Sequence, residues 1–182
     1  MRKQQIELLL HEAGTIARER EFFIIGSQAA HAYCDEAPAE VLVSRECDIY
    51  PKNRPEAVLL LTAKLGPESQ FARDKGYYAD VVTPDLATLP AGWESRVKPL
   101  ALGPVTALCL DINDLLVSKL AAGRLKDMEF AAALLHLGFA EEAALIERIE
   151  LLDSEADRTQ VQGHLKIVMN DLRAANKARG RQ

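Results

Sequence analysis

The chain has 182 residues, of which 48% are hydrophobic and 27% are charged. This composition is typical of a globular protein that can bury a core, and it excludes a disordered chain. No apolar run approaches the roughly 18 residues of a membrane span, and Glu7 and Glu12 interrupt the apolar run that a signal peptide would need. We therefore expect a cytoplasmic protein without a membrane partner. The net charge of −5 gives the surface as a whole no attraction for nucleic acid.

The first 110 residues predict strands interspersed with helices. Residues 3–20 have the apolar periodicity of an amphipathic helix. Apolar or β-branched runs bounded by turn residues predict strands at Phe22–Ile25, within Val41–Tyr50, at Tyr77–Val82, at Lys98–Leu102 and at Val105–Leu110. Further helices are predicted at Gln28–Cys34 after a capping Ser27, at Glu56–Leu65 and at Ser69–Lys75.

From Asp111 onward the sequence contains no strand signal. Capping residues and helical periodicity predict four helices, at 111–122, 125–137, 141–152 and about 155–176. The chain therefore divides into a region with strands and helices, 1–110, and a C-terminal helical half, 111–182. This arrangement places the protein in the α+β class.

Two acidic residues stand one residue apart in the second predicted strand. Because side chains alternate along a strand, Glu46 and Asp48 project to one face while Cys47 projects to the other. Neighbouring carboxylates repel each other unless a cation lies between them, and their hard oxygens suit Mg²⁺ or Mn²⁺. We therefore predict a metal pair, the alternative being a solvated strand edge.

A third acid, Asp80, lies in the next predicted strand. It could hold a second metal or take a proton from an attacking hydroxyl. Asp74 and Asp85 are alternatives for this role. The Gly26-Ser27 turn before a helix frees backbone N–H groups that can hold a phosphate.

A second group of candidate residues lies in the run from Ser118 to Asp127. Lys119 stands among leucines, an unusual place for a purely solvated charge, and it could neutralise phosphate charge. The alternative is a salt-bridge group on a helix surface, because Arg124 and Asp127 are three residues apart.

These motifs resemble a known family. A strand, Gly-Ser, a short helix and a strand with an acid-x-acid pair are similar to the active-site signature of the nucleotidyltransferase superfamily, which has the polymerase-beta-like fold. The run Asp114–Asp127 resembles the helical motif of its AbiEii-like and uncharacterised prokaryotic branches, many of which are toxins encoded with an antitoxin. The loop Leu89–Arg96 resembles an uncharacterised branch, so the resemblance covers about residues 20–135. It implies a small mixed β-sheet flanked by helices.

The resemblance also implies an activity. An NTP is held with Mg²⁺ or Mn²⁺, and an oxygen of an RNA or protein acceptor attacks its α-phosphorus while pyrophosphate leaves. A cognate antitoxin is an expected further partner. By position, the resemblance implies that Gly26 and Ser27 bind phosphate and that Glu46, Asp48 and Asp80 are metal ligands. Asp80 and Lys119 are the implied catalytic residues. Lys119, Arg124 and Asp127 are the further residues implied to bind the nucleotide.

The chain departs from the superfamily at the first acid, where Glu46 replaces the more common Asp. The extra methylene changes where a metal can sit. Two alternatives to nucleotidyl transfer therefore stay open, a catalytically inactive protein that acts as a binding or regulatory partner, and metal-dependent phosphodiester hydrolysis by the same carboxylates.

Overall fold

A computed structural model describes residues 1–34 and 36–179 of the chain. These residues form two compact units. The first unit comprises Met1–Ala87 and Glu94–Asp111, and the second comprises Thr88–Trp93 and the chain from Ile112 onward. The short segment Thr88–Trp93 is tied to the helices of its unit, because the Ala91 N–H donates to the Leu151 carbonyl at 2.8 Å. Each unit is described by itself.

The first unit contains a five-stranded mixed sheet. Its strands are β1 (Glu21–Ile24), β2 (Glu46–Pro51), β3 (Tyr78–Val81), β4 (Lys98–Leu102) and β5 (Val105–Cys109), in the order β3-β2-β1-β5-β4. Strand β1 is antiparallel to β2 and parallel to β5, β3 is parallel to β2, and β4 is antiparallel to β5. This sheet confirms the predicted α+β class and the nucleotidyltransferase-like arrangement.

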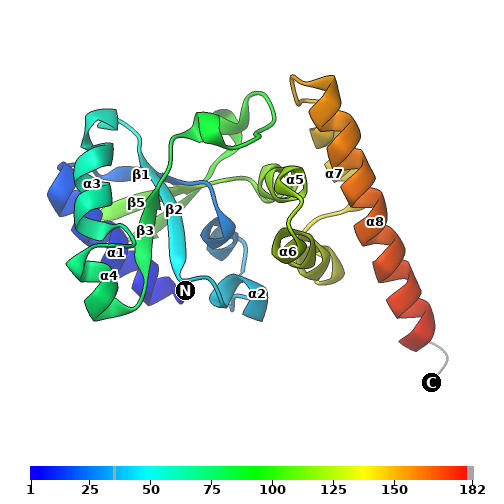
Figure 1. Cartoon of the computed structure of the whole chain (residues 1–182), viewed down its shortest axis with the longest axis horizontal. Helices are drawn as coiled ribbons and strands as arrows, with labels where there is room; N and C mark the ends of the chain where they lie inside the picture. Colours follow the sequence, from blue (N-terminus) through cyan, green and yellow to red (C-terminus); the bar gives the residue numbers. More distant parts are fainter. Residues whose placement is uncertain (35, 180–182) are drawn as a thin grey trace. The chain divides into compact units, whose positions relative to one another are not determined.

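Helices α1 (Lys3–Ala17), α3 (Val58–Leu65) and α4 (Gln70–Lys75) lie on one side of this sheet (Figure 1). Helix α1 contacts β5 and α3, and α3 contacts β3. The core of the unit forms there, from side chains that are fully buried: Ile6, Leu9 and Leu10 of α1, Phe22 and Ile24 of β1, Ile49 of β2 and Leu61 of α3. The short helices of the unit are η1 (Ser27–Ala32), α2 (Ala39–Leu42), η2 (Pro55–Ala57) and η3 (Pro84–Leu86), and η4 (Trp93–Arg96) begins at the unit boundary.

The second unit is helical. Helix α5 (Ile112–Ala122) packs against α6 (Leu125–His136), α7 (Glu142–Ile149) and α8 (Glu155–Arg179). Asp114, which is fully buried, accepts a hydrogen bond of 2.7 Å from Arg148 and so ties α5 to α7. Of the helices in the described part of the chain, none combines the length and apolar character that crossing a membrane requires.

The strand predicted within Val41–Tyr50 is β2, which begins at Glu46 and is preceded by the short helix α2. One local prediction differs from the structure. Ser27, expected to cap an α-helix, is instead the first residue of the 3₁₀ helix η1, and Gly26 occupies the N-cap position. The Ser27 hydroxyl accepts a hydrogen bond from the Gln28 side chain rather than from the helix backbone.

Candidate active site

Two acidic residues occupy facing register positions of the parallel strands β2 and β3. Asp48 and Asp80 are register partners, and both side chains are half-buried. Adjacent strands lie about 4.8 Å apart, and like charges directly opposite each other destabilise a sheet. Burial, and then the negative charge of Glu46, raise the pKa of Asp80 above its ordinary value. The acids on this face, Glu46, Asp48 and Asp80, therefore favour a cation beside them.

Glu46 belongs to the preceding register position, where its partner is Tyr78. The Tyr78 hydroxyl donates a hydrogen bond of 3.1 Å to Glu46 Oε2. Burial, followed by the charge of Glu46 and this hydrogen bond, raises the pKa of Tyr78. The sequence alone groups Glu46 with Asp48 along one strand, whereas the structure pairs each of them with a residue of β3.

Gly26 provides the surface against which Asp48 lies. A Cβ atom at Gly26 would overlap Oδ2 and Cγ of Asp48 and would lie 2.9 Å from Asp48 Cβ. The backbone is joined at the same place, because the Ile25 N–H donates to the Asp48 carbonyl at 3.1 Å. The structure thus brings the predicted Gly-Ser turn and the predicted metal ligand Asp48 into direct contact. Ser27 follows in η1 and is buried.

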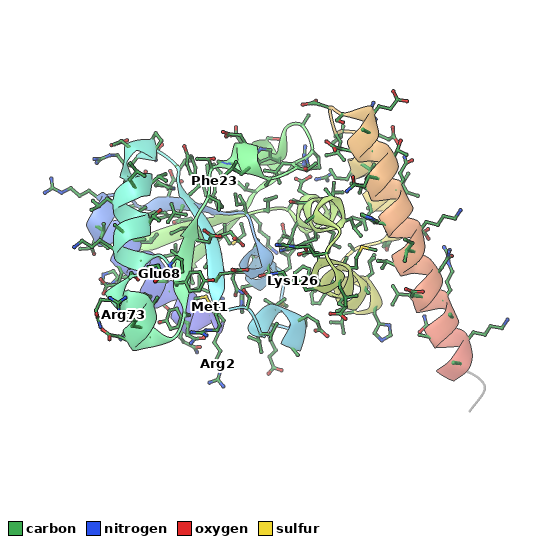
Figure 2. The ribbon with its side chains drawn as sticks, in the orientation of Figure 1. Met1, Arg2, Phe23, Glu68, Arg73 and Lys126 are labelled. Carbon is green, nitrogen blue, oxygen red and sulfur yellow. The ribbon has the colours of Figure 1, made fainter. Side chains whose placement is uncertain are left out.

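The two alternatives to Asp80 lie elsewhere in the first unit. Asp74 is on α4, next to Arg73, which Figure 2 labels there, and it accepts a hydrogen bond of 2.6 Å from Gln70. Asp85 is in η3 and is exposed. Of these three acids, Asp80 is the one whose register partner is Asp48.

The carboxylates fit a divalent cation that completes its coordination with substrate. Within residues 1–34 and 36–179, no three His, Cys, Asp or Glu side chains are grouped closely enough to hold a metal by themselves. Mg²⁺, however, is usually bound by one or two carboxylates together with substrate phosphates and water. Asp48 and Asp80, opposite each other on one face, supply such a pair of hard oxygen donors.

In the second unit, Lys119, Arg124 and Asp127 form one charged group. The Asp127 carboxylate lies 3.3 Å from Lys119 Nζ and 2.5 Å from Arg124 Nε, and Arg124 Nη2 donates to its other oxygen at 3.2 Å. The Lys119 ammonium also lies 5.8 Å from the centre of the Phe130 ring, in a cation–π contact. The structure therefore brings these three predicted residues together.

Asp127 orients the two cations and is itself covered. Its side chain is 2% exposed, whereas those of Lys119 and Arg124 are 18% and 59% exposed. Burial by itself would raise the pKa of Asp127, but the hydrogen bond from Arg124 and the charges of Lys119 and Arg124 outweigh burial and lower that pKa. The neighbouring Lys126, labelled in Figure 2, is exposed. Within this group, the cations are thus the parts open to a ligand.

Two residues of the site were missed by sequence reasoning. Tyr78 precedes Asp80 by two residues, just as Glu46 precedes Asp48. The parallel register pairs Glu46 with Tyr78 and Asp48 with Asp80. This shared spacing is the feature of the sequence that could have indicated Tyr78. Gln28 is fully buried, and its amide nitrogen donates to the Ser27 hydroxyl and to the Val41 carbonyl at 3.4 and 3.1 Å. Its Oε1 has no hydrogen-bond partner among the described residues, and no sequence signal indicates that.

Comparison with known proteins identifies the family of the chain. A family model described as "Nucleotidyltransferase of unknown function (DUF6036)" matches residues 4–137, which include the sheet, the carboxylates and the Lys119 group. The match confirms the predicted relationship to nucleotidyltransferases, whereas the AbiEii-like branch is not confirmed. No curated protein and no solved structure matches the chain.

The contact between Gly26 and Asp48 predicts a non-additive pair of substitutions. We expect Gly26→Ala to destabilise the protein by about 1–3 kcal/mol, because the new methyl group displaces the Asp48 side chain. In an Asp48→Ala background the cost should fall by at least half, since Oδ2 and Cγ are gone. Chemical denaturation of the four proteins measures the coupling.

Gly163→Ala is the matched control for this cycle. Gly163 lies within α8 with open space around it, so alanine should stabilise the protein by about 0.5–1 kcal/mol. An undiminished cost of Gly26→Ala in the Asp48→Ala background would contradict the proposed packing.

The Lys119 group predicts a pH-dependent contribution to stability. Asp127→Asn should cost on the order of 2 kcal/mol at pH 7, less than for a fully buried pair because Arg124 is 59% exposed. The folded-state pKa of Asp127 is lowered, so its stabilisation is full above the unfolded-state pKa of about 3.9 and is lost as the pH falls through the lower folded-state pKa.

Denaturation of wild type and Asp127→Asn at several pH values between 3 and 7 tests this expectation. The stability difference should shrink only at the acidic end of the series. Asp171→Asn, at an exposed position of α8, serves as the control. A stability difference between wild type and Asp127→Asn that does not change with pH would argue against the assigned role of this carboxylate.

Proposed function

Because the chain belongs to a family of nucleotidyltransferases of unknown function, we propose that it is a Mg²⁺- or Mn²⁺-dependent enzyme that transfers an NMP from an NTP to an acceptor. The observation that carries the proposal is the placement of Asp48 and Asp80 on facing register positions, with Asp48 packed on Gly26. A cytoplasmic location is part of the proposal, in keeping with three cysteines that form no disulfide among the described residues.

The proposed reaction is an in-line displacement at the α-phosphorus. A hydroxyl oxygen of the acceptor forms a bond to the α-phosphorus, and the bond from that phosphorus to the bridging oxygen of the β-phosphate breaks. Pyrophosphate leaves with the bond's electron pair. Asp80 is the proposed acceptor of the hydroxyl proton. Asp48 and Asp80, together with the third predicted ligand Glu46, would hold the divalent cation, which when bound supplies positive charge to the phosphates.

The remaining predicted residues have proposed roles in holding the nucleotide. Gly26 and Ser27 are proposed to contact phosphate oxygens, as the family resemblance implies. Lys119 and Arg124 are proposed to bind anionic groups of the nucleotide. An ammonium has three N–H donors and a guanidinium has five, so both side chains retain donors while they contact Asp127. Asp127 is proposed to act on the nucleotide through these two cations.

The acceptor and the biological setting are proposed from the sequence resemblance. The resemblance of the Asp114–Asp127 run to toxin branches of the superfamily is the basis for three proposals: an RNA or protein acceptor, a role as a toxin, and a cognate antitoxin. Incubation with each labelled NTP, Mg²⁺ and either total RNA or lysate protein identifies the acceptor by which macromolecule becomes labelled.

Substitution of Asp48 tests the proposed activity. Asp48→Asn should lower transfer of label from the NTP at least 100-fold, because it removes a charge that the transition state needs. Asp74→Asn and Asp85→Asn remove the same charge at positions away from the facing pair and should retain transfer. Unchanged transfer in Asp48→Asn would refute the site assignment, and release of free NMP without labelling of an acceptor would indicate phosphodiester hydrolysis.

A second candidate function is a catalytically inactive binding or regulatory partner. The observation that favours it is the hydrogen bond from Tyr78 to Glu46, which occupies one oxygen of the acid at the position where the superfamily more commonly has Asp. An inactive member would retain the fold without needing to bind an NTP and a metal together.

Thermal denaturation separates the two functions. An active site predicts that at least one NTP raises the midpoint of unfolding only when Mg²⁺ is present, because ligands that bind the native state stabilise it. The same addition should leave the midpoint of Asp48→Asn nearly unchanged. The absence of a shift with all four NTPs would favour the inactive partner.

A further inference from the structure

We propose that Gln28 is a positioning residue that holds the Ser27 hydroxyl as a hydrogen-bond donor for a phosphate oxygen of the nucleotide. The inference rests on the proposed function, in which Ser27 contacts phosphate, and deepens it. It starts from a polar side chain that is fully buried in the first unit. The Gln28 amide nitrogen in η1 donates to Ser27 Oγ at 3.4 Å and to the Val41 carbonyl at 3.1 Å.

The Val41 carbonyl fixes which way the Gln28 amide faces. A backbone carbonyl only accepts hydrogen bonds, so the amide nitrogen and not Oε1 must point toward it. A turned amide would set Oε1 against the Val41 oxygen, which would bring two acceptors together without a hydrogen between them. The orientation of the amide therefore follows from the backbone of α2, to which Val41 belongs.

The amide in turn fixes the Ser27 hydroxyl. The amide nitrogen has two N–H groups, of which one goes to Val41 and the other to Ser27. Because Ser27 Oγ accepts this second bond, its own hydrogen must point elsewhere, and no acceptor for it occurs among the described residues. Phosphate oxygens are negatively charged acceptors, so a hydroxyl held in this way presents the donor that a phosphate needs.

Burial of the Gln28 amide carries a cost that this role explains. The side chain is fully buried, and its Oε1 has no hydrogen-bond partner within residues 1–34 and 36–179. A buried acceptor without a partner destabilises the fold, and an apolar side chain of the same shape would avoid that cost. The use of glutamine at this position therefore lies in its two N–H groups.

The position of Ser27 suits a phosphate contact. Ser27 follows Gly26, which lies against the Asp48 carboxylate. A divalent cation beside Asp48 would take phosphate oxygens into its remaining coordination positions. The oriented hydroxyl is thus one residue away from the glycine that contacts the proposed metal ligand.

A double-mutant cycle between Gln28 and Ser27 tests the inference. The probe is the NTP that raises the unfolding midpoint of wild type most in the presence of Mg²⁺, and calorimetric titration without an acceptor gives its affinity. Ser27→Ala should weaken binding about tenfold, the low end for a hydrogen bond to a charged group. Gln28→Met has nearly the same volume and lacks both N–H donors. It should weaken binding about threefold, because only one of the three staggered positions of a free hydroxyl points at the phosphate.

The coupling between the two substitutions is the decisive measurement. In the Gln28→Met background, Ser27→Ala should weaken binding only about threefold. In the Ser27→Ala background, Gln28→Met should have no effect, because no hydroxyl is left to orient. A Gln28 side chain that served only the fold would instead lower the affinity equally in both backgrounds.

Gln70→Met is the matched control. Gln70 is exposed on α4, where its amide donates to Asp74 at 2.6 Å, so this substitution should leave the full effect of Ser27→Ala. Gln28→Asn is a second variant for the case that circular dichroism shows Gln28→Met to be unfolded. It keeps an amide, but its shorter side chain draws the N–H groups back from both acceptors, and it should show the same loss of coupling.

An undiminished effect of Ser27→Ala in the Gln28 variants would overturn the inference. So would weaker binding on adding Gln28→Met to Ser27→Ala, or failure of both Gln28 variants to fold, since Gln28 would then act without the hydroxyl. If Ser27→Ala binds the NTP as wild type does, the inference fails and the proposed function stands. If no NTP binds wild type, the proposed function fails and the inference fails with it.

Discussion

The contact between Asp48 and Gly26 is the constraint on which the candidate site depends. It places a carboxylate where any other residue at position 26 would put its Cβ, and it joins the end of β1 to the middle of β2. Because Gly26 has an ordinary extended backbone, its role is to leave space and not to adopt an unusual conformation. The same glycine is the N-cap of η1, so the proposed phosphate-binding turn and the proposed metal ligand are fixed by a single small residue.

The parallel pairing of β2 with β3 then decides which acids cooperate. It sets Asp48 opposite Asp80 and Glu46 opposite Tyr78. A shift of two residues in this register would have paired Glu46 with Asp80 and left Tyr78 without a partner on β2. Glu46 and Asp48 lie on the same face of β2, so the register alone decides which of them stands opposite Asp80.

In the second unit, one buried carboxylate organises two cations. Asp127 is 2% exposed and contacts Lys119 from α5 and Arg124 from the start of α6. Helix α8 contacts the end of α5 that precedes this group. The Gln160 side chain donates to the Ala121 carbonyl at 2.9 Å, and His164 Nδ1 lies 2.6 Å from the Leu120 carbonyl oxygen. The family match ends at residue 137, so this support comes from a part of the chain beyond the matched region.

The sequence by itself determined the α+β class, nearly every helix and strand, and the family, because apolar periodicity and the spacing of Gly26-Ser27, the acid pair and Lys119 are local properties. It could not determine the partner of Glu46, since that partner lies 32 residues away on another strand. Nor could it show which of Asp74, Asp80 and Asp85 stands opposite Asp48 on the neighbouring strand, or that Asp127 is buried. Only the tertiary structure decided these points, because strand register and burial arise from packing between segments that are distant in the chain.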